Sequence, residues 1–515
     1  MHKKMFRRWF RKLFRRRFYV AILLVLQVVF LVRLVLSGSR LSLGINLLLT
    51  LASTAAVIYI VAKRDKGANK TVWVILILSL PLFGGLLYLL FNFQSSTRRI
   101  RLEAEKAHRK AMPLYALPGS AVHTLCAASS QHTAQVRYLA EYAGYPVYQN
   151  SHTEYYSSGE TLWKAMLQQL KTAERYIFLE YFIIEEGRMW DDILEVLKRK
   201  AQQGVKVRVL YDDMGCFLTL PHDYAAKLRQ EGIECAVFNP FRPFLTTIQN
   251  NRDHRKIMVI DGTTAFTGGA NLADEYINVI EKHGHWRDTG IRMDGAAAWS
   301  FTLMFLEMWE LCTKQNEDYL AYYPWQHCSC AAASDGYLQP YADSPLDTDN
   351  VGEHVYLQII NNAKDYVYIS TPYLIVDDSM VSALTLAAKS GVDVRIITPQ
   401  CWDKWPIHMT TRSYYRELVR AGVKIYEYSG GFNHAKTFVS DDRTAAVGTI
   451  NLDFRSLYLH FECGVLLLEG TVIRSIKDDF VSTLAHCHRV TEEDCTPNLF
   501  VRTVQDVLRL FAPLM

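Results

Sequence analysis

The stretch that decides the fold is Asn251-Arg-Asp-His254-Arg-Lys256-Ile-Met-Val-Ile-Asp261-Gly-Thr-Thr-Ala-Phe-Thr-Gly268-Gly269-Ala-Asn271. Its apolar run 257–260 contains β-branched residues and predicts a buried strand, and Asp261-Gly262 is typical of a hairpin turn. Residues 263–267 are expected to return as the second strand. A histidine, a lysine and an asparagine can then share one end of the sheet. There a neutral imidazole can attack phosphorus or take a proton, and an ammonium and an amide can hold anionic oxygens.

The same pattern occurs a second time, as His434-Ala-Lys436-Thr-Phe-Val-Ser-Asp441 followed by Gly448-Thr449-Ile-Asn451. From His, the Lys, Asp, Gly and Asn follow after two, seven, fourteen and seventeen residues in both copies. Four spacings that agree twice are far more specific than one short motif. The likeness extends to the pairs 173–181 and 363–371, 204–210 and 391–397, and 287–291 and 461–465. The sequence therefore predicts two copies of one α/β unit of about 150 residues, a normal domain size.

Within each copy, strands alternate with helices. In the first, the apolar periodicity predicts helices over 159–170 and 189–203 and strands over 176–184 and 205–210, which favours parallel pairing with helical cover. Residues 313–350 lack clear periodicity, contain three prolines and are interpreted as the connection between the halves. The domains are placed at 145–325 and 326–515, after a charged helical linker over 97–144.

The paired HxKxxxxD motifs resemble those of the phospholipase D superfamily. Residues 251–257, 268–276 and 448–462 are similar to bacterial cardiolipin synthases, and the resemblance covers about 72–515. It implies two pseudo-symmetric phospholipase D-like α/β domains. It also implies phosphatidyl transfer through a phosphohistidine, with phosphatidylglycerol as substrate and cardiolipin and glycerol as products. No cofactor is expected.

Cleavage of a phosphodiester needs a nucleophile, an acid for the leaving oxygen, and cations around the phosphoryl oxygens. Two copies that face each other would supply all three. We expect His254 to attack and His434 to protonate the departing glycerol, although the sequence leaves their order open. The phosphate-binding groups are expected to be Lys256, Lys436, Asn271 and Asn451.

Four carboxylates are candidates for the same site. The motif includes Asp261 and Asp441 in its catalytic set, but each follows its strand at the turn, which favours a hydrogen-bonding role there. Asp288 and Glu462 are paired by the repeat and are the better candidates to orient the histidines. A carboxylate on the far imidazole nitrogen fixes the tautomer and stabilises the cation.

No metal is expected. The pairs His283/His285 and His486/His488 have no matching distant cluster, and Cys328/Cys330 lacks the spacing of a zinc finger.

The start of the chain differs in character from the rest. Residues 1–17 carry nine Lys or Arg and no acid, so the net charge of +5 becomes negative for the remainder, which argues against a nucleic-acid partner. The arm could form a helix at the surface of an anionic membrane. Alternatively, its positive charges only fix the orientation of the following segments in the membrane. Three apolar segments follow within 18–96, at about 18–36, 43–62 and 72–93, each close to the length that spans a bilayer. We expect a multi-pass protein of the bacterial cell membrane; the sidedness stays open.

Other functions fit parts of the pattern. A phospholipase D-type hydrolase or a phosphatidylserine synthase would use the same histidines with another acceptor. A nuclease of the superfamily fits less well, because of the apolar segments and the acidic body. A non-catalytic membrane scaffold would be expected to have lost one histidine, and both are present.

Overall fold

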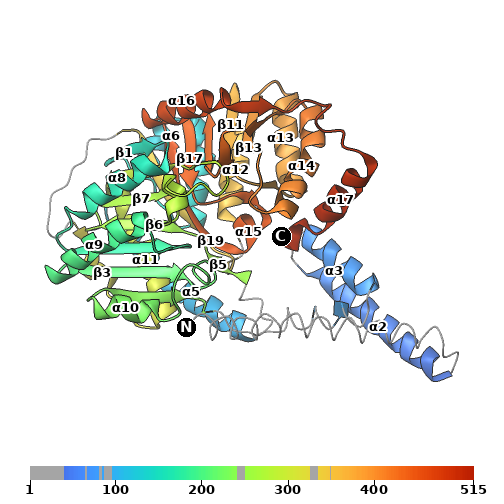
Figure 1. Cartoon of the computed structure of the whole chain (residues 1–515), viewed down its shortest axis with the longest axis horizontal. Coiled ribbons are helices and arrows are strands. Elements are labelled where there is room, and N and C mark those ends of the chain that lie inside the picture. The colour runs from blue at the N-terminus through green and yellow to red at the C-terminus, as the bar shows by residue number, and fades with distance from the viewer. Residues whose placement is uncertain are drawn as a thin grey trace. The chain divides into compact units, whose positions relative to one another are not determined.

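The computed structural model in Figure 1 describes residues 40–63, 67–79, 84–85, 88, 95–240, 250–324, 335–347 and 349–514. Residues 100–240 and 251–513 form one compact unit, which holds both predicted copies. The described residues before 100 belong to a separate unit. The protein has a mixed α/β fold, as predicted from the alternation of strands and helices.

The first copy is built on a seven-stranded sheet of order β1-β9-β7-β6-β2-β3-β4. Its three strands β2, β3 and β4 are parallel, whereas β6 and β7 form the antiparallel hairpin that the opening stretch predicts. Helices alternate with the parallel strands, as expected. The strands are β1 (Ser151–Tyr156), β2 (Tyr176–Tyr181), β3 (Lys206–Asp212), β4 (Glu234–Phe238), β6 (Lys256–Ile260), β7 (Thr264–Gly268) and β9 (Gly290–Gly295), and the helices α8 (Gly159–Leu170), α9 (Arg188–Gln202), α10 (Tyr224–Gln230) and α11 (Ala296–Thr313).

The second copy repeats this sheet. Its order β10-β19-β17-β16-β11-β13-β14 matches β1-β9-β7-β6-β2-β3-β4 strand for strand, and β20 is added next to β14. The strands are β10 (Tyr337–Asp343), β11 (Tyr366–Ser370), β13 (Asp393–Pro399), β14 (Lys424–Tyr428), β16 (Thr437–Ser440), β17 (Thr444–Gly448), β19 (His460–Leu468) and β20 (Cys487–Arg489), and the helices α12 (Val351–Asn362), α13 (Asp378–Lys389), α14 (Trp405–Arg420), α16 (Val472–Leu484) and α17 (Leu499–Leu510).

The two hairpin turns have left-handed backbone angles at both central residues, the geometry of a type I′ turn. The φ angles are 52° at Asp261 and 72° at Gly262, and 53° and 55° at Asp441 and Asp442. Asp tolerates this region better than most residues because its short side chain hydrogen-bonds locally. The turn fixes the register, in which Ile260 faces Thr264.

One prediction about the connection between the halves is wrong. Residues 313–350 contain β10, which pairs antiparallel with β19 along its whole length. The strand was missed because Pro340 lies inside it, and a proline argues against a central strand. As an edge strand, β10 tolerates a residue without an N–H.

The predicted linker is part of the compact unit from residue 100 onward. Helix α5 (Ser95–Tyr115) contacts α11 through hydrogen bonds to Glu307, at 2.7 Å from the Tyr115 hydroxyl and 3.1 Å from His108 Nδ1. Its charged face is therefore only partly exposed.

The N-terminal unit contains α2 (Arg40–Ala62) and α3 (Gly67–Ser79). Helix α2 covers the second predicted apolar segment, and α3 covers part of the third. The basic arm and the first segment lie outside the described residues. In the parts of the chain that the structure describes, no helix combines the length and apolar character needed to cross a membrane.

Candidate active site

The two histidines lie at the carboxyl ends of the central parallel strands. His254 precedes β6, whose first residue, Lys256, is opposite Tyr181 at the end of β2. In the second copy, β16 begins at Thr437, opposite Ser370 at the end of β11. Ligands of open α/β sheets bind at this edge.

Each histidine is attached to the other half of the molecule. Strand β5 (Arg252–Asp253) runs parallel to β19, and the His254 N–H donates to the Phe461 carbonyl at 2.9 Å. Likewise β15 (Gly431–Asn433) runs parallel to β8 (His285–Arg287), and the His434 N–H donates to the Arg287 carbonyl at 2.7 Å. The next residue along each receiving strand is a carboxylate.

Those carboxylates bind the histidines crosswise between the copies. Glu462 Oε1 lies 2.9 Å from His254 Nδ1, and Asp288 Oδ2 lies 2.7 Å from His434 Nδ1. An ionised carboxylate can only accept, so in the ionised state of each pair Nδ1 carries the proton and Nε2 keeps its lone pair. Both carboxylates are fully buried. The structure thus brings together the four groups predicted as histidines and orienting carboxylates.

The Asp-for-Glu difference between the copies has a local cause. In the first copy, a Cβ at Gly269 would lie 2.0 Å from Asp288 Oδ1, so only glycine leaves room for this carboxylate. In the second, Thr449 occupies the equivalent position and its hydroxyl donates to Glu462 Oε2. The glycine and threonine of the two motifs are therefore matched to their carboxylates.

Two buried lysines complete the centre. The Nζ of Lys256 donates to the His254 carbonyl at 2.6 Å, and that of Lys436 to the His434 carbonyl at 2.5 Å. Burial lowers the pKa of Lys256 to about 8 and that of Lys436 to about 7. These two amines are positioned to meet the oxygens of an anion.

Burial and the two lysines also favour the neutral form of both histidines. Burial, followed by Lys436, lowers the pKa of His434 to about 4, and burial with Lys256 lowers the pKa of His254 well below its usual value. Burial raises the pKa of Glu462 to about 7, against the pull of Lys256. Burial also acts to raise the pKa of Asp288, but His434 and Lys436 outweigh it and hold that pKa below its usual value.

The asparagines have other partners. Asn271 Oδ1 accepts from the Ile183 N–H at 3.1 Å, and its Nδ2 donates to the Tyr276 hydroxyl at 2.7 Å. It fixes the loop after β2 and holds the Tyr276 ring 5.7 Å from that of His434. The amide oxygen of Asn451 is buried without a hydrogen-bond partner. Phosphate binding by the two asparagines stays a prediction.

The motif aspartates lie away from the histidines, at the opposite ends of their strands. Asp261 accepts from the backbone N–H groups of Glu174, Arg175 and Tyr176, each at 2.8 Å. Asp441 does the same for residues 364–366. At about 3.3 Å per residue, seven residues separate each from its histidine by roughly 20 Å. This placement favours the turn role, and a part for the two aspartates in catalysis stays a prediction.

Sequence reasoning missed the aromatic side chains around the histidines. The Phe182 ring lies 5.1 Å from His254, and the Trp286 ring 5.2 Å from His434. It also missed His460, whose ring lies 5.6 Å from that of His254. No pattern marks Trp286 or His460, because only the crossed strand pairing brings them to the site. The loop position of Phe182, directly after β2, is the one available signal.

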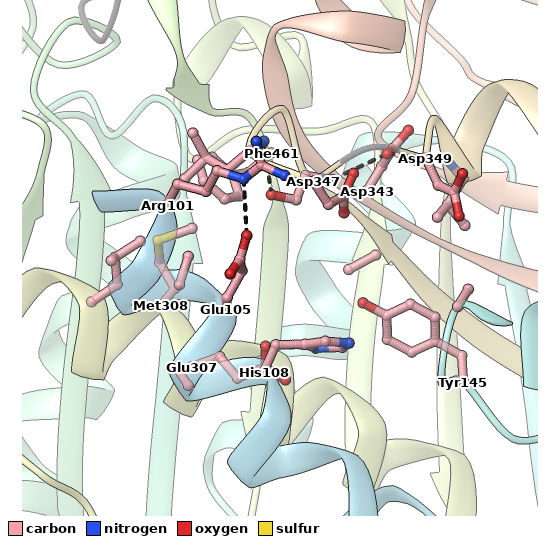
Figure 2. A pocket seen from close by; sticks show the side chains of 18 of the residues that line it. Arg101, Glu105, His108, Tyr145, Glu307, Met308, Asp343, Asp347, Asp349 and Phe461 are labelled. Carbon is pink, nitrogen blue, oxygen red and sulfur yellow. Dashed lines mark hydrogen bonds and ion pairs between the residues drawn. The ribbon is translucent and has the colours of Figure 1, made fainter. Parts of the chain in front are cut away.

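A cavity next to the site is lined by several carboxylates, whose negative charge would repel phosphate. This cavity of about 270 Å³ is lined by Arg255 and Phe461, the neighbours of His254 and Glu462, and by residues of α5 and α11. Figure 2 shows its carboxylates, with Arg101 already bound to one of them. Burial raises the pKa of Asp347 to about 7. The acidic lining residues are Glu105, Glu307, Asp343, Asp347 and Asp349.

Comparison with known proteins identifies the family to which the chain is similar. The family described as "Cardiolipin synthase, PLD-like domain" matches residues 166–281 and 356–484, and "Phospholipase D-nuclease N-terminal" matches residues 51–91. A cardiolipin synthase of Alkalihalophilus pseudofirmus is 34% identical over 91% of this chain and 94% of its own. An uncharacterized protein of Streptococcus mutans is 43% identical over 89% and 99%.

Among solved structures, phosphatidylserine synthase of Haemophilus influenzae has the same fold, with a TM-score of 0.54 and 15% identity over 70% of this chain and 93% of that one. The matched domains cover both copies of the motif, and the cardiolipin synthase relative covers nearly the whole chain. The chain therefore belongs to the bacterial cardiolipin synthases of the phospholipase D superfamily.

Proposed function

We propose that this enzyme is a phosphatidyltransferase that makes cardiolipin and glycerol from two molecules of phosphatidylglycerol, through a phosphohistidine. The observation that carries the proposal is the crossed arrangement of the histidines, in which each has its Nδ1 on a carboxylate of the other half. Membership of the cardiolipin synthases supports cardiolipin as the product.

In the first half-reaction, Nε2 of His254 attacks the phosphorus and the bond from phosphorus to the glycerol headgroup breaks. His434 Nε2 gives a proton to the departing glycerol oxygen. The anionic phosphodiester favours the protonated form of His434, which is neutral in the empty site. Glu462 stabilises the positive charge that His254 gains on attack.

In the second half-reaction, the roles reverse. His434, now neutral, takes the proton from the glycerol hydroxyl of a second phosphatidylglycerol, whose oxygen attacks phosphorus while the bond to His254 breaks. Lys256 and Lys436 hold the phosphoryl oxygens in both steps. One phosphodiester is made for each one broken, so the equilibrium lies near unity and no nucleotide is needed.

We also propose that the N-terminal region holds the enzyme at the cell membrane as a multi-pass segment. Support comes from the apolar runs of the sequence and from α2, where Leu47, Leu48 and Leu51 are more than 60% exposed. A surface of exposed leucines is unfavourable in water and favourable in lipid.

The test is lipid analysis after incubating purified protein with phosphatidylglycerol alone. Cardiolipin and glycerol should form in equal amounts, and labelled glycerol should exchange into phosphatidylglycerol. Steady release of phosphatidic acid without exchange would instead identify a hydrolase. Synthesis only when serine and an activated lipid are supplied would identify a phosphatidylserine synthase.

A further inference from the structure

His460 is a buried imidazole that lacks a hydrogen-bond partner in the part of the chain that the structure describes. It begins β19, two residues before Glu462, and its side chain is 10% exposed. Neither ring nitrogen has a hydrogen-bond partner among the described residues, although both are buried. Burial of a polar group without a partner is unfavourable. The mechanism proposed above gives this side chain no part.

Its surroundings match a metal site. One ring nitrogen each of His254 and His460 and a carboxylate oxygen of Glu462 lie within 4.8 Å of one another. Glu462 Oε1 is 2.9 Å from His254 Nδ1 and 4.0 Å from His460 Nδ1. Bonds of about 2.0–2.1 Å in a tetrahedral zinc site place neighbouring ligand atoms roughly 3.3 Å apart. The two separations from Glu462 lie on either side of that spacing.

We infer that His254, His460 and Glu462 form a zinc site that inhibits the enzyme by binding its proposed nucleophile. Two imidazoles and one carboxylate suit Zn²⁺, whereas Mg²⁺ and Ca²⁺ prefer oxygen ligands alone. The negative charge of Glu462 favours a cation here, against the nearby Lys256 and Lys436 and, around His460, Arg252 and Arg455. The open coordination positions of such a three-ligand site can hold water.

Zinc on either nitrogen of His254 stops attack on phosphorus. On Nε2, it occupies the lone pair that must form the bond to phosphorus. On Nδ1, it displaces the proton there to Nε2, and no proton leaves the imidazole. In both cases the phosphohistidine cannot form until zinc dissociates. The effect on activity rests on the proposed function, but the binding of zinc does not.

The test uses the full chain in detergent, titrated with Zn²⁺ alone by calorimetry, and then assayed by glycerol exchange. His460→Asn should abolish one zinc site and raise the zinc concentration for half-inhibition at least tenfold, while the variant stays active in zinc-free buffer. His488→Asn is the matched control, because His488 is an exposed histidine bound to Asp494 at 3.1 Å. It should leave both readings unchanged.

Equal zinc binding by the native protein and His460→Asn would overturn the inference, and so would equal inhibition. If His460→Asn shows no cooperative thermal transition, the binding measurement uses Glu462→Gln instead. This variant should also lose the zinc site, and retention of the site would count against the inference. The native protein could prove inactive on phosphatidylglycerol while His460→Asn still abolishes one zinc site. That result would refute the proposed function but not the zinc site.

Discussion

Gly269→Ala should disable the half of the site that contains His434. The new Cβ would lie 2.0 Å from Asp288 Oδ1, and ordinary contact begins near 3.4 Å. The carboxylate must therefore retreat by more than 1 Å, which breaks its 2.7 Å hydrogen bond to His434. A correctly placed acid or base contributes about 10²–10⁴-fold. At about 1.36 kcal/mol per tenfold, the barrier should rise by roughly 3–5 kcal/mol.

The assay is glycerol exchange into phosphatidylglycerol, with thermal unfolding recorded for each variant. Gly67→Ala is the control, because nothing lies within 4 Å of its built Cβ. The pair Gly269→Thr with Asp288→Glu copies the arrangement of Thr449 and Glu462, and should recover activity relative to Gly269→Ala. A folded Gly269→Ala enzyme with near-native exchange would refute the role given to Asp288.

Three further predictions concern charge and stability. Burial lowers the pKa of Lys436 to about 7, so the ammonium that binds phosphate is lost above that pH. The KM for phosphatidylglycerol should therefore rise by up to about tenfold per pH unit, and Lys436→Arg should flatten this pH profile. A flat profile of the native enzyme would contradict the prediction. Asp261→Asn and Asp441→Asn should each lower the free energy of unfolding, measured by denaturant titration, by about 1–3 kcal/mol. The kcat of both variants should stay nearly unchanged. A large loss of kcat in a stable variant would instead support a catalytic role for the aspartate. Deletion of residues 2–17 should weaken binding to anionic vesicles in a flotation assay and leave turnover in detergent intact; a well-folded but inactive deletion would argue otherwise.

Much of the fold could be predicted because its signals are local. The hairpin turn at Asp261, the apolar face of α8 and the strand-helix alternation each depend on residues close in sequence. The repeated spacing added the long-range information that two sheets of the same order exist. Strand β10 was missed because its partner β19 lies far along the chain and Pro340 masks its pattern.

The sequence identified the candidate histidines and carboxylates of the site, but it did not show which carboxylate binds which histidine. The repeat identified Asp288 and Glu462, but only the parallel pairing of β5 with β19 and of β15 with β8 shows that each serves the histidine of the other copy. His460 gives no sequence signal, since a histidine at a strand start is usually a packed core residue. Only the three-dimensional structure shows that its two ring nitrogens lack hydrogen-bond partners among the described residues.

The central claim is that two histidines, one from each copy, form a single transfer site. Rapid quenching of the enzyme with labelled phosphatidylglycerol, followed by mass-spectrometric location of the acid-labile adduct, tests it most directly. We predict a phosphatidyl group on His254, lost in His254→Ala and retained in His434→Ala, with neither variant able to complete cardiolipin synthesis. An adduct confined to His434 would exchange the two roles. Near-native synthesis by either alanine variant, or an adduct on neither histidine, would contradict the shared site.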